Sequence, residues 1–189
     1  TLLADSHKDN IRDARMEGLR TYYGNPVSER ADQILDLVGI GRMLGLSPDP
    51  EANALAAIRY KPEFGTAEIF SIQSSVDLSD EKRRMVSREF RGKLLFGEEI
   101  SYQVLDKMLH NGATVRETRL SETFDYQDFI RTHWKRAVPL FAIDPKGRLR
   151  PFLAEQTLEP EKEWTILALV EPELTRNNDD RNTHEGADQ

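Results

Sequence analysis

Asp5 is the residue whose type and position point most directly to chemistry. It follows the apolar run Leu2-Leu3-Ala4, which is typical of a buried strand. In a dinucleotide-binding half, the second strand ends in an acid whose carboxylate accepts both ribose hydroxyls of an adenosine. Asp5 also precedes a helix that we expect to be capped by Ser6, so a loop acid or a helix-terminus acid explains it as well.

Polar residues follow two further expected strands. Gly24-Asn25 comes after the strand that holds Tyr22-Tyr23, and Ser47-Pro48-Asp49 ends the next one. Ligands of open α/β sheets bind outside the carboxyl ends of the strands, so we expect these turns and Asp5 to line one crevice. The two tyrosines are explained most simply as one core and one surface residue, although a stack on adenine is the alternative.

Several enzyme chemistries find no support in the sequence. It has no cysteine, which excludes disulfides, thiolate zinc sites and cysteine nucleophiles. Its four histidines lack metal-ligand spacing, and there is no G-x-S-x-G motif. The acids Glu98-Glu99 would point to different sides of a strand, and no proton donor stands in a hydride-transfer position. We therefore expect neither catalysis nor a metal site.

Strands and helices alternate with short joins through the first half of the chain. The expected strands cover residues 1–5, 20–23, 42–47 and 67–73, and the expected helices cover 7–18, 29–35 and about 51–60. Ile11, Ala14 and Met16 are predicted to face inward from the first helix. Ala54, Leu55 and Ile58 share one face of the third helix, and Pro62 and Gly65 end it. This alternation is typical of a parallel sheet with right-handed crossovers.

The pattern changes after residue 75. Residues 76–93 are expected to form a linker and a basic segment, residues 94–170 a second domain, and residues 171–189 a disordered acidic tail. Within the second domain we expect a strand at 94–97, a helix from Ser101 to about 111, an extended run at 114–120, a helix at 124–133, a hairpin at 138–153 and a closing strand at 164–170. The turn Asp144-Pro145-Lys146-Gly147 is the strongest hairpin signal.

The composition is that of a soluble globular chain. Its 189 residues are 38% hydrophobic and 31% charged, with a net charge of -7. No apolar run approaches the roughly 20 residues of a membrane span, and no secretory signal is visible. The negative charge disfavours nucleic acid as a partner.

Residues 1–73 resemble the nucleotide-binding lobe of the RCK/KTN (TrkA-like) family, which regulates potassium conductance and transport. The resemblance is carried by Leu2-Leu3-Ala4-Asp5, Gly24-Asn25, Gly39-Ile40 and the stretch LGLSPDPEANALAAIRY at 44–60, in which Asp49, Glu51 and Asn53 match the family's order. The family usually has Gly-Asp where this chain has Gly24-Asn25. Its glycine-rich loop has no counterpart here, so we expect the chain to begin at the second strand of the lobe.

The second half resembles the smaller companion domain of the same regulators, more loosely. The matching features are residues 115–120, the hairpin at 138–152 and the closing strand at 164–170. The segment Arg20-Thr21-Tyr22-Tyr23-Gly24-Asn25-Pro26 and the hairpin are most similar to the cytoplasmic tail of bacterial NhaP-like sodium:proton antiporters. The expected fold class is therefore α/β, with a partial Rossmann-like lobe of parallel sheet followed by a smaller α+β domain.

The resemblance implies a non-enzymatic regulatory domain of a sodium or potassium:proton antiporter, on the cytoplasmic side of the bacterial inner membrane. The transporter domain would lie upstream in the same polypeptide, and the lobes would pair as a homodimer through the helix at 51–60 and the strand at 67–73. No cofactor is required, and an adenine nucleotide or NAD(H) would be a regulatory ligand. Its contacts would be Asp5, Ser6, Gly24, Asn25, Ser47, Asp49 and Asn53. The alternatives are a fragment of a nucleotide-dependent oxidoreductase and a purely dimerising protein-interaction module.

Overall fold

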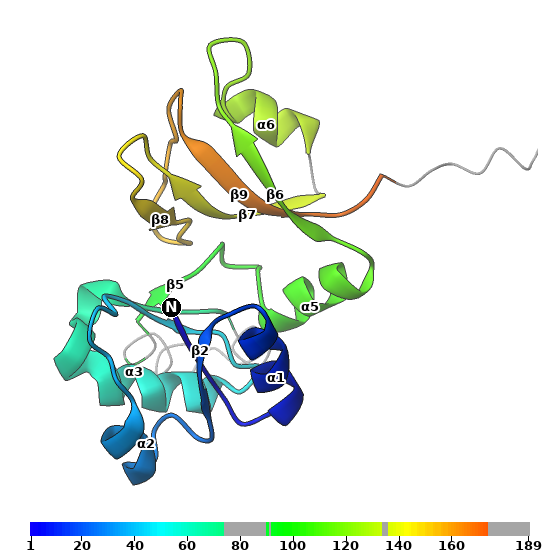
Figure 1. Cartoon of the computed structure of the whole chain (residues 1–189). Coiled ribbons are helices and arrows are strands. Elements are labelled where there is room, and N and C mark those ends of the chain that lie inside the picture. The colour runs from blue at the N-terminus through cyan, green and yellow to red at the C-terminus, as the bar shows by residue number, and fades with distance from the viewer. Residues whose placement is uncertain (74–89, 91, 134–135, 174–189) are drawn as a thin grey trace, which may run out of the picture.

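The computed structural model describes residues 1–73, 90, 92–133 and 136–173. It is a mixed α/β structure with parallel strands in its first half and an antiparallel sheet in its second (Figure 1). Within these residues, no helix combines the length and the apolar character that crossing a membrane requires. The predicted basic segment lies almost entirely outside the described residues, as does the predicted acidic tail beyond residue 173.

The chain opens with a strand–helix–strand unit. β1 (Leu2–Asp5) pairs in parallel with β2 (Arg20–Tyr23), and α1 (Lys8–Met16) connects them. The unit confirms three predicted elements, but the expected cap at Ser6 is wrong, because His7 occupies the N-cap position and the Asp5 carboxylate accepts its backbone N–H. Gly24 closes the unit by donating its backbone N–H to the Asp5 carbonyl oxygen at 2.9 Å.

A second parallel sheet follows in the order β3-β4-β5. After α2 (Glu29–Ile34) come β3 (Met43–Gly45), α3 (Pro50–Phe64), a short 3-10 helix η1 (Thr66–Glu68), β4 (Ile69–Ser71) and β5 (Lys93–Leu94). The predicted cap of α2 is confirmed, since the Ser28 side chain accepts the Ala31 backbone N–H. All strand pairs of the first half are parallel, as the sequence predicts.

The second half is an antiparallel sheet in the order β6-β9-β7-β8. Its elements are α5 (Tyr102–His110), β6 (Thr114–Arg119), α6 (Tyr126–Thr132), β7 (Ala137–Ile143), β8 (Leu149–Pro151) and β9 (Thr165–Val170). The predicted hairpin is confirmed: the Asp144 carboxylate accepts the backbone N–H groups of Lys146 and Arg148, and Gly147 takes a φ of 75°. In its main cluster the most deeply buried large side chains are Phe129, Leu120 and Ile166, and α6 lies beside the sheet (Figure 1).

The two halves are joined by backbone pairing as well as by chain connection. β5, which we expected to open the second domain, pairs with β4 instead, and the next residue, Leu95, bridges to Leu153. Arg42 adds a side-chain link: its Nε donates to Glu68 at 2.7 Å and its Nη1 donates to the Leu149 carbonyl oxygen at 2.6 Å. The parallel and antiparallel sheets are therefore fixed to each other through β5 and through Arg42.

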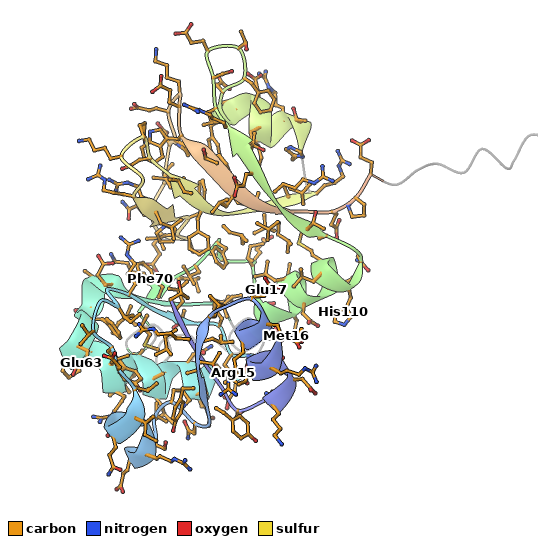
Figure 2. The ribbon with its side chains drawn as sticks, viewed as in Figure 1. Arg15, Met16, Glu17, Glu63, Phe70 and His110 are labelled. Atoms are coloured by element: carbon orange, nitrogen blue, oxygen red, sulfur yellow. The ribbon has the colours of Figure 1, made fainter. Side chains whose placement is uncertain are left out.

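One predicted helix face is wrong in part. On α1, Ile11 and Ala14 are buried, but Met16, labelled in Figure 2 at the end of the helix, is 76% exposed. Met16 follows Ile11 by five residues, which places it about 140° around the helix. On α3, Leu55 and Ile58 are exposed, because the helix packs against β3 and β4 through the face that holds Asn53, Ala56, Ala57 and Tyr60.

Two further boundaries differ from prediction. Pro62 does not end α3, which continues to Phe64 and stops at Gly65. A proline in the last turn removes a single helical hydrogen bond, which the helix tolerates there. The strand expected over 67–73 is shortened to β4, whose three residues are all buried, Phe70 among them (Figure 2).

Candidate functional site

A cleft of about 740 Å³ lies where β1 and β3 end. We call it the strand-end cleft. Of the seven residues predicted to contact a ligand, five line it: Asp5, Ser6, Asn25, Ser47 and Asp49. Its other lining residues are Ala4, His7, Asn10, Pro26, Leu46, Pro48, Ala52 and Tyr102. The structure therefore brings together the turns after β1, β2 and β3, and Gly24 and Asn53 are not among the lining residues.

The Asp5 carboxylate, at the end of β1, holds the start of α1 in place through hydrogen bonds. Its Oδ1 accepts the His7 backbone N–H at 2.7 Å and lies 3.1 Å from His7 Nδ1, and its Oδ2 accepts the Asn10 amide at 2.7 Å. Burial raises the pKa of Asp5, but the hydrogen bonds from Asn10 and His7 outweigh burial, so the net pKa shift is downward. A carboxylate offers about four acceptor positions, so Oδ2 keeps capacity for one more donor.

Asn53 acts as a clamp rather than as a lining residue. It is 6% exposed, its Oδ1 accepts the Ser47 backbone N–H at 3.0 Å, and its Nδ2 donates to the Ser47 carbonyl oxygen at 2.8 Å. Both backbone groups of Ser47 are thereby held by one amide of α3. Gly45 makes this approach feasible, because a Cβ there would lie 3.1 Å from Asn53 Oδ1.

Gly24 and Asn25 shape the second turn. Gly24 has a φ of 142°, and a Cβ built on it would lie 3.4 Å from the Tyr22 ring. Asn25 is exposed, and its Oδ1 accepts the Val27 backbone N–H at 3.0 Å. Tyr22 is buried and Tyr23 is 54% exposed, which confirms the prediction of one core and one surface tyrosine. Neither ring lines the strand-end cleft.

The charge of the cleft is set by two carboxylates. Asp5 and Asp49 both line it, and Asp49 also caps α3 by accepting the Glu51 backbone N–H at 2.9 Å. The amino-terminal ends of α1 and α3 meet here, but their own acids occupy donors that an anion would otherwise use. The arrangement suits a ligand that donates hydrogen bonds, such as a sugar with free hydroxyls, better than a polyanion.

Among the lining residues that the sequence did not reveal, Tyr102 is the one from the second half of the chain. It is the first residue of α5 and reaches the cleft from the second half of the chain, while every other lining residue lies between positions 4 and 52. The sequence shows an aromatic after the capping Ser101, but strand-end logic applies only to the parallel sheet. Among the described residues, no group of three or more His, Asp or Glu side chains could hold a metal ion.

No family model matches the chain, and no curated protein matches it either.

Proposed function

We propose that this chain is a regulatory domain of a cation:proton antiporter that senses an adenosine-containing nucleotide in the strand-end cleft. The observation that carries the ligand proposal is the placement of Asp5, an ionised carboxylate with a free acceptor position, at the end of β1 beside the turns after β2 and β3. Asp5 accepts the ribose hydroxyls, and the domain acts by binding rather than by catalysis.

The sheet topology supports a Rossmann-like lobe. In the Rossmann strand order 3-2-1-4-5-6, the first strand stands between the second and the fourth. The parallel strands of this chain form two groups, β1-β2 and β3-β4-β5, and residues that follow β1 and β3 line the same cleft, which fits a break between these two strands. That is the place of the first strand if β1 corresponds to the second strand of the order.

The charge of the cleft narrows the ligand class. Asp5 and Asp49 repel phosphate groups held near them, so the nucleoside part lies in the cleft and any phosphates extend away from it. Adenosine and AMP are therefore expected to bind this chain more tightly than ADP, ATP or NAD(H). Tighter binding of ATP than of adenosine would show that this ligand class is wrong.

Titration calorimetry with Asp5 variants tests the ribose contact. Charge-assisted hydrogen bonds are worth about 1.5–3 kcal/mol, so Asp5→Ala should weaken adenosine binding at least roughly tenfold. Asp5→Asn should be milder, because its amide keeps one acceptor oxygen. Thermal melts of each variant measure the separate loss of the contact to the start of α1, about 1 kcal/mol.

Asp9→Ala is the matched control. Asp9 is an exposed acid in the first turn of α1, paired with Arg12 at 2.9 Å, and it does not line the cleft. It removes the same charge from the same helix end and should leave the adenosine affinity unchanged. If Asp5→Ala lowers only the melting temperature, or if adenosine does not bind the parent chain, the proposed nucleotide site is wrong.

The transporter part of the proposal has its own test. We place the domain on the cytoplasmic side of the bacterial inner membrane, as a homodimer attached to a transporter domain that precedes it. Reading the coding sequence on the amino-terminal side of Thr1 should reveal about ten apolar segments of roughly 20 residues each. A preceding sequence without such segments contradicts the antiporter assignment and leaves the nucleotide site to be judged by calorimetry.

A further inference from the structure

Tyr102 is the aromatic side chain that faces the proposed nucleoside site. Among the described residues that line the strand-end cleft it is the only Phe, Tyr or Trp, and it is half-buried. It stands on α5, so it belongs to a different part of the chain from Asp5, which lies at the end of β1.

The ring of Tyr102 is not used by the fold as other tyrosines are. The Tyr60 hydroxyl donates to the Pro26 carbonyl oxygen, and the Tyr126 ring stacks on Phe129 and Phe152. The Tyr102 side chain makes no hydrogen bond, ion pair or ring contact with any residue that the structure describes. It also belongs to neither hydrophobic cluster, although its neighbours Val104 and Leu105 pack against one of them.

The backbone beneath Tyr102 is firmly held. Ser101 is 3% exposed and caps α5, its side chain accepting the Val104 backbone N–H at 3.3 Å. Ser101 also forms a parallel bridge with Gln73, two residues beyond the end of β4. The start of α5 is thereby fixed to the parallel sheet, and Tyr102 is presented to the cleft from a rigid support.

We infer that Tyr102 is the platform on which the base of the bound nucleoside stacks, an inference that rests on the proposed nucleoside site. Every base has a π face, so an aromatic platform supplies affinity with little choice between bases. Asp5 then holds the ribose from β1 while Tyr102 covers the base from α5. The bound nucleoside contacts both halves of the chain at once.

Calorimetry with adenosine and 2′,3′-dideoxyadenosine separates the two contacts. Tyr102→Ala should weaken both ligands by the same factor, about tenfold, because stacking does not depend on the ribose hydroxyls. Asp5→Ala should weaken adenosine strongly and dideoxyadenosine little. Tyr102→Phe keeps the ring and should bind adenosine as the parent does, whereas Tyr102→Leu keeps apolar bulk without a π face and should lose affinity as Tyr102→Ala does.

Tyr23→Ala is the matched control, since Tyr23 is an exposed tyrosine that does not line the cleft. It should leave both affinities unchanged. If adenosine binds and Asp5→Ala weakens it while Tyr102→Ala and Tyr102→Leu do not, the platform is wrong and the nucleoside site stands. If Tyr102→Phe loses as much as Tyr102→Ala, the ring face is not what binds, which also overturns the inference. If adenosine does not bind the parent chain, the proposed function fails first.

Discussion

At the residue scale, His133 couples the fold to pH. Its Nδ1 is buried and has no hydrogen-bond partner in the part of the chain that the structure describes, and its ring lies 4.8 Å from that of Phe129. Burial lowers the pKa of His133, and the charges of Arg136 and Arg116 lower it further, against a smaller opposing effect of Glu173. His133 is therefore harder to protonate in the folded chain than in the unfolded one.

The sign of the pH dependence follows from this shift. Below about pH 6.5 the unfolded chain binds a proton at His133 before the folded chain does, so acid favours unfolding. The stabilisation that neutral His133 provides is present above about pH 6.5 and is lost as the pH falls toward the lower folded-state pKa. Thermal melts between pH 7.5 and 5.5 should show that His133→Gln reduces the fall in melting temperature.

His110→Gln is the control for that measurement. The His110 side chain is 76% exposed and lies 3.5 Å from Asp106, so its replacement should leave the slope between pH 7.5 and 5.5 close to that of the parent. Equal slopes for the parent and His133→Gln would contradict the role of His133.

The positions of the candidate ligand contacts could be predicted from sequence, but their roles could not. Asp5 and Ser47 were found because apolar runs mark strands, and the ends of parallel strands meet at one edge of a sheet. Asn53 was expected to contact a ligand, yet its amide holds Ser47, because that depends on how closely α3 approaches β3. The position of Tyr102 at the cleft depends on how the second half of the chain folds against the first, and local sequence pattern does not encode this.

At the element scale, the pairing of β5 with β4 depends on Gly92. This glycine has a φ of 77°, and a Cβ there would lie 2.5 Å from the Ile69 carbonyl oxygen and 2.8 Å from Ile69 Cγ2. Gly92→Ala should lower the free energy of unfolding by about 3 kcal/mol, because a left-handed backbone and a backbone clash add together. Urea unfolding measures this loss.

Gly18→Ala separates the clash from the backbone conformation. Gly18 has a φ of 78° just beyond α1, and a Cβ there would meet nothing within 4 Å. Gly18→Ala should lower the free energy of unfolding by about 1 kcal/mol, which is the cost of the left-handed backbone alone. Equal losses for the two variants would show that β5 moves away from β4 without cost.

The elements were predictable where pattern and turn chemistry agree. The capped helices α2 and α5 and the hairpin at Asp144 follow from Ser28, Ser101 and the turn residues, all of which act locally. Side-chain size does not identify the buried face of α3. Close packing on β3 and β4 selects Ala56 and Ala57, and it leaves Leu55 and Ile58 outside.

At the scale of the whole molecule, the chain is two sheets of different kind held by a few defined links. β5 lies in the parallel sheet while the residue after it bridges toward the antiparallel one, so the connection itself carries hydrogen bonds. Tyr102 begins the next helix at the edge of the strand-end cleft. The nucleoside that we propose, held by Asp5 and Tyr102, would therefore contact residues of both halves.

At the scale of the whole molecule, we also predict that the chain forms a dimer. The expected dimer contact through residues 67–73 is wrong as a surface, since Ile69, Phe70 and Ile72 are buried within the chain. The other expected contact, the helix at 51–60, is exposed: Leu55 is 56% and Ile58 50% accessible, and their spacing of three places them on one face of α3.

Sedimentation of the parent chain at tens of micromolar, about the range in which a weak interface populates, should show a dimer. The double variant Leu55→Glu with Ile58→Glu should shift it to monomer, because two charges would be buried in the contact. Met16→Glu, at a more exposed apolar position on α1, should leave the dimer intact. A parent chain that sediments only as monomer contradicts the homodimer, and a dimer insensitive to the double variant places the contact elsewhere than α3.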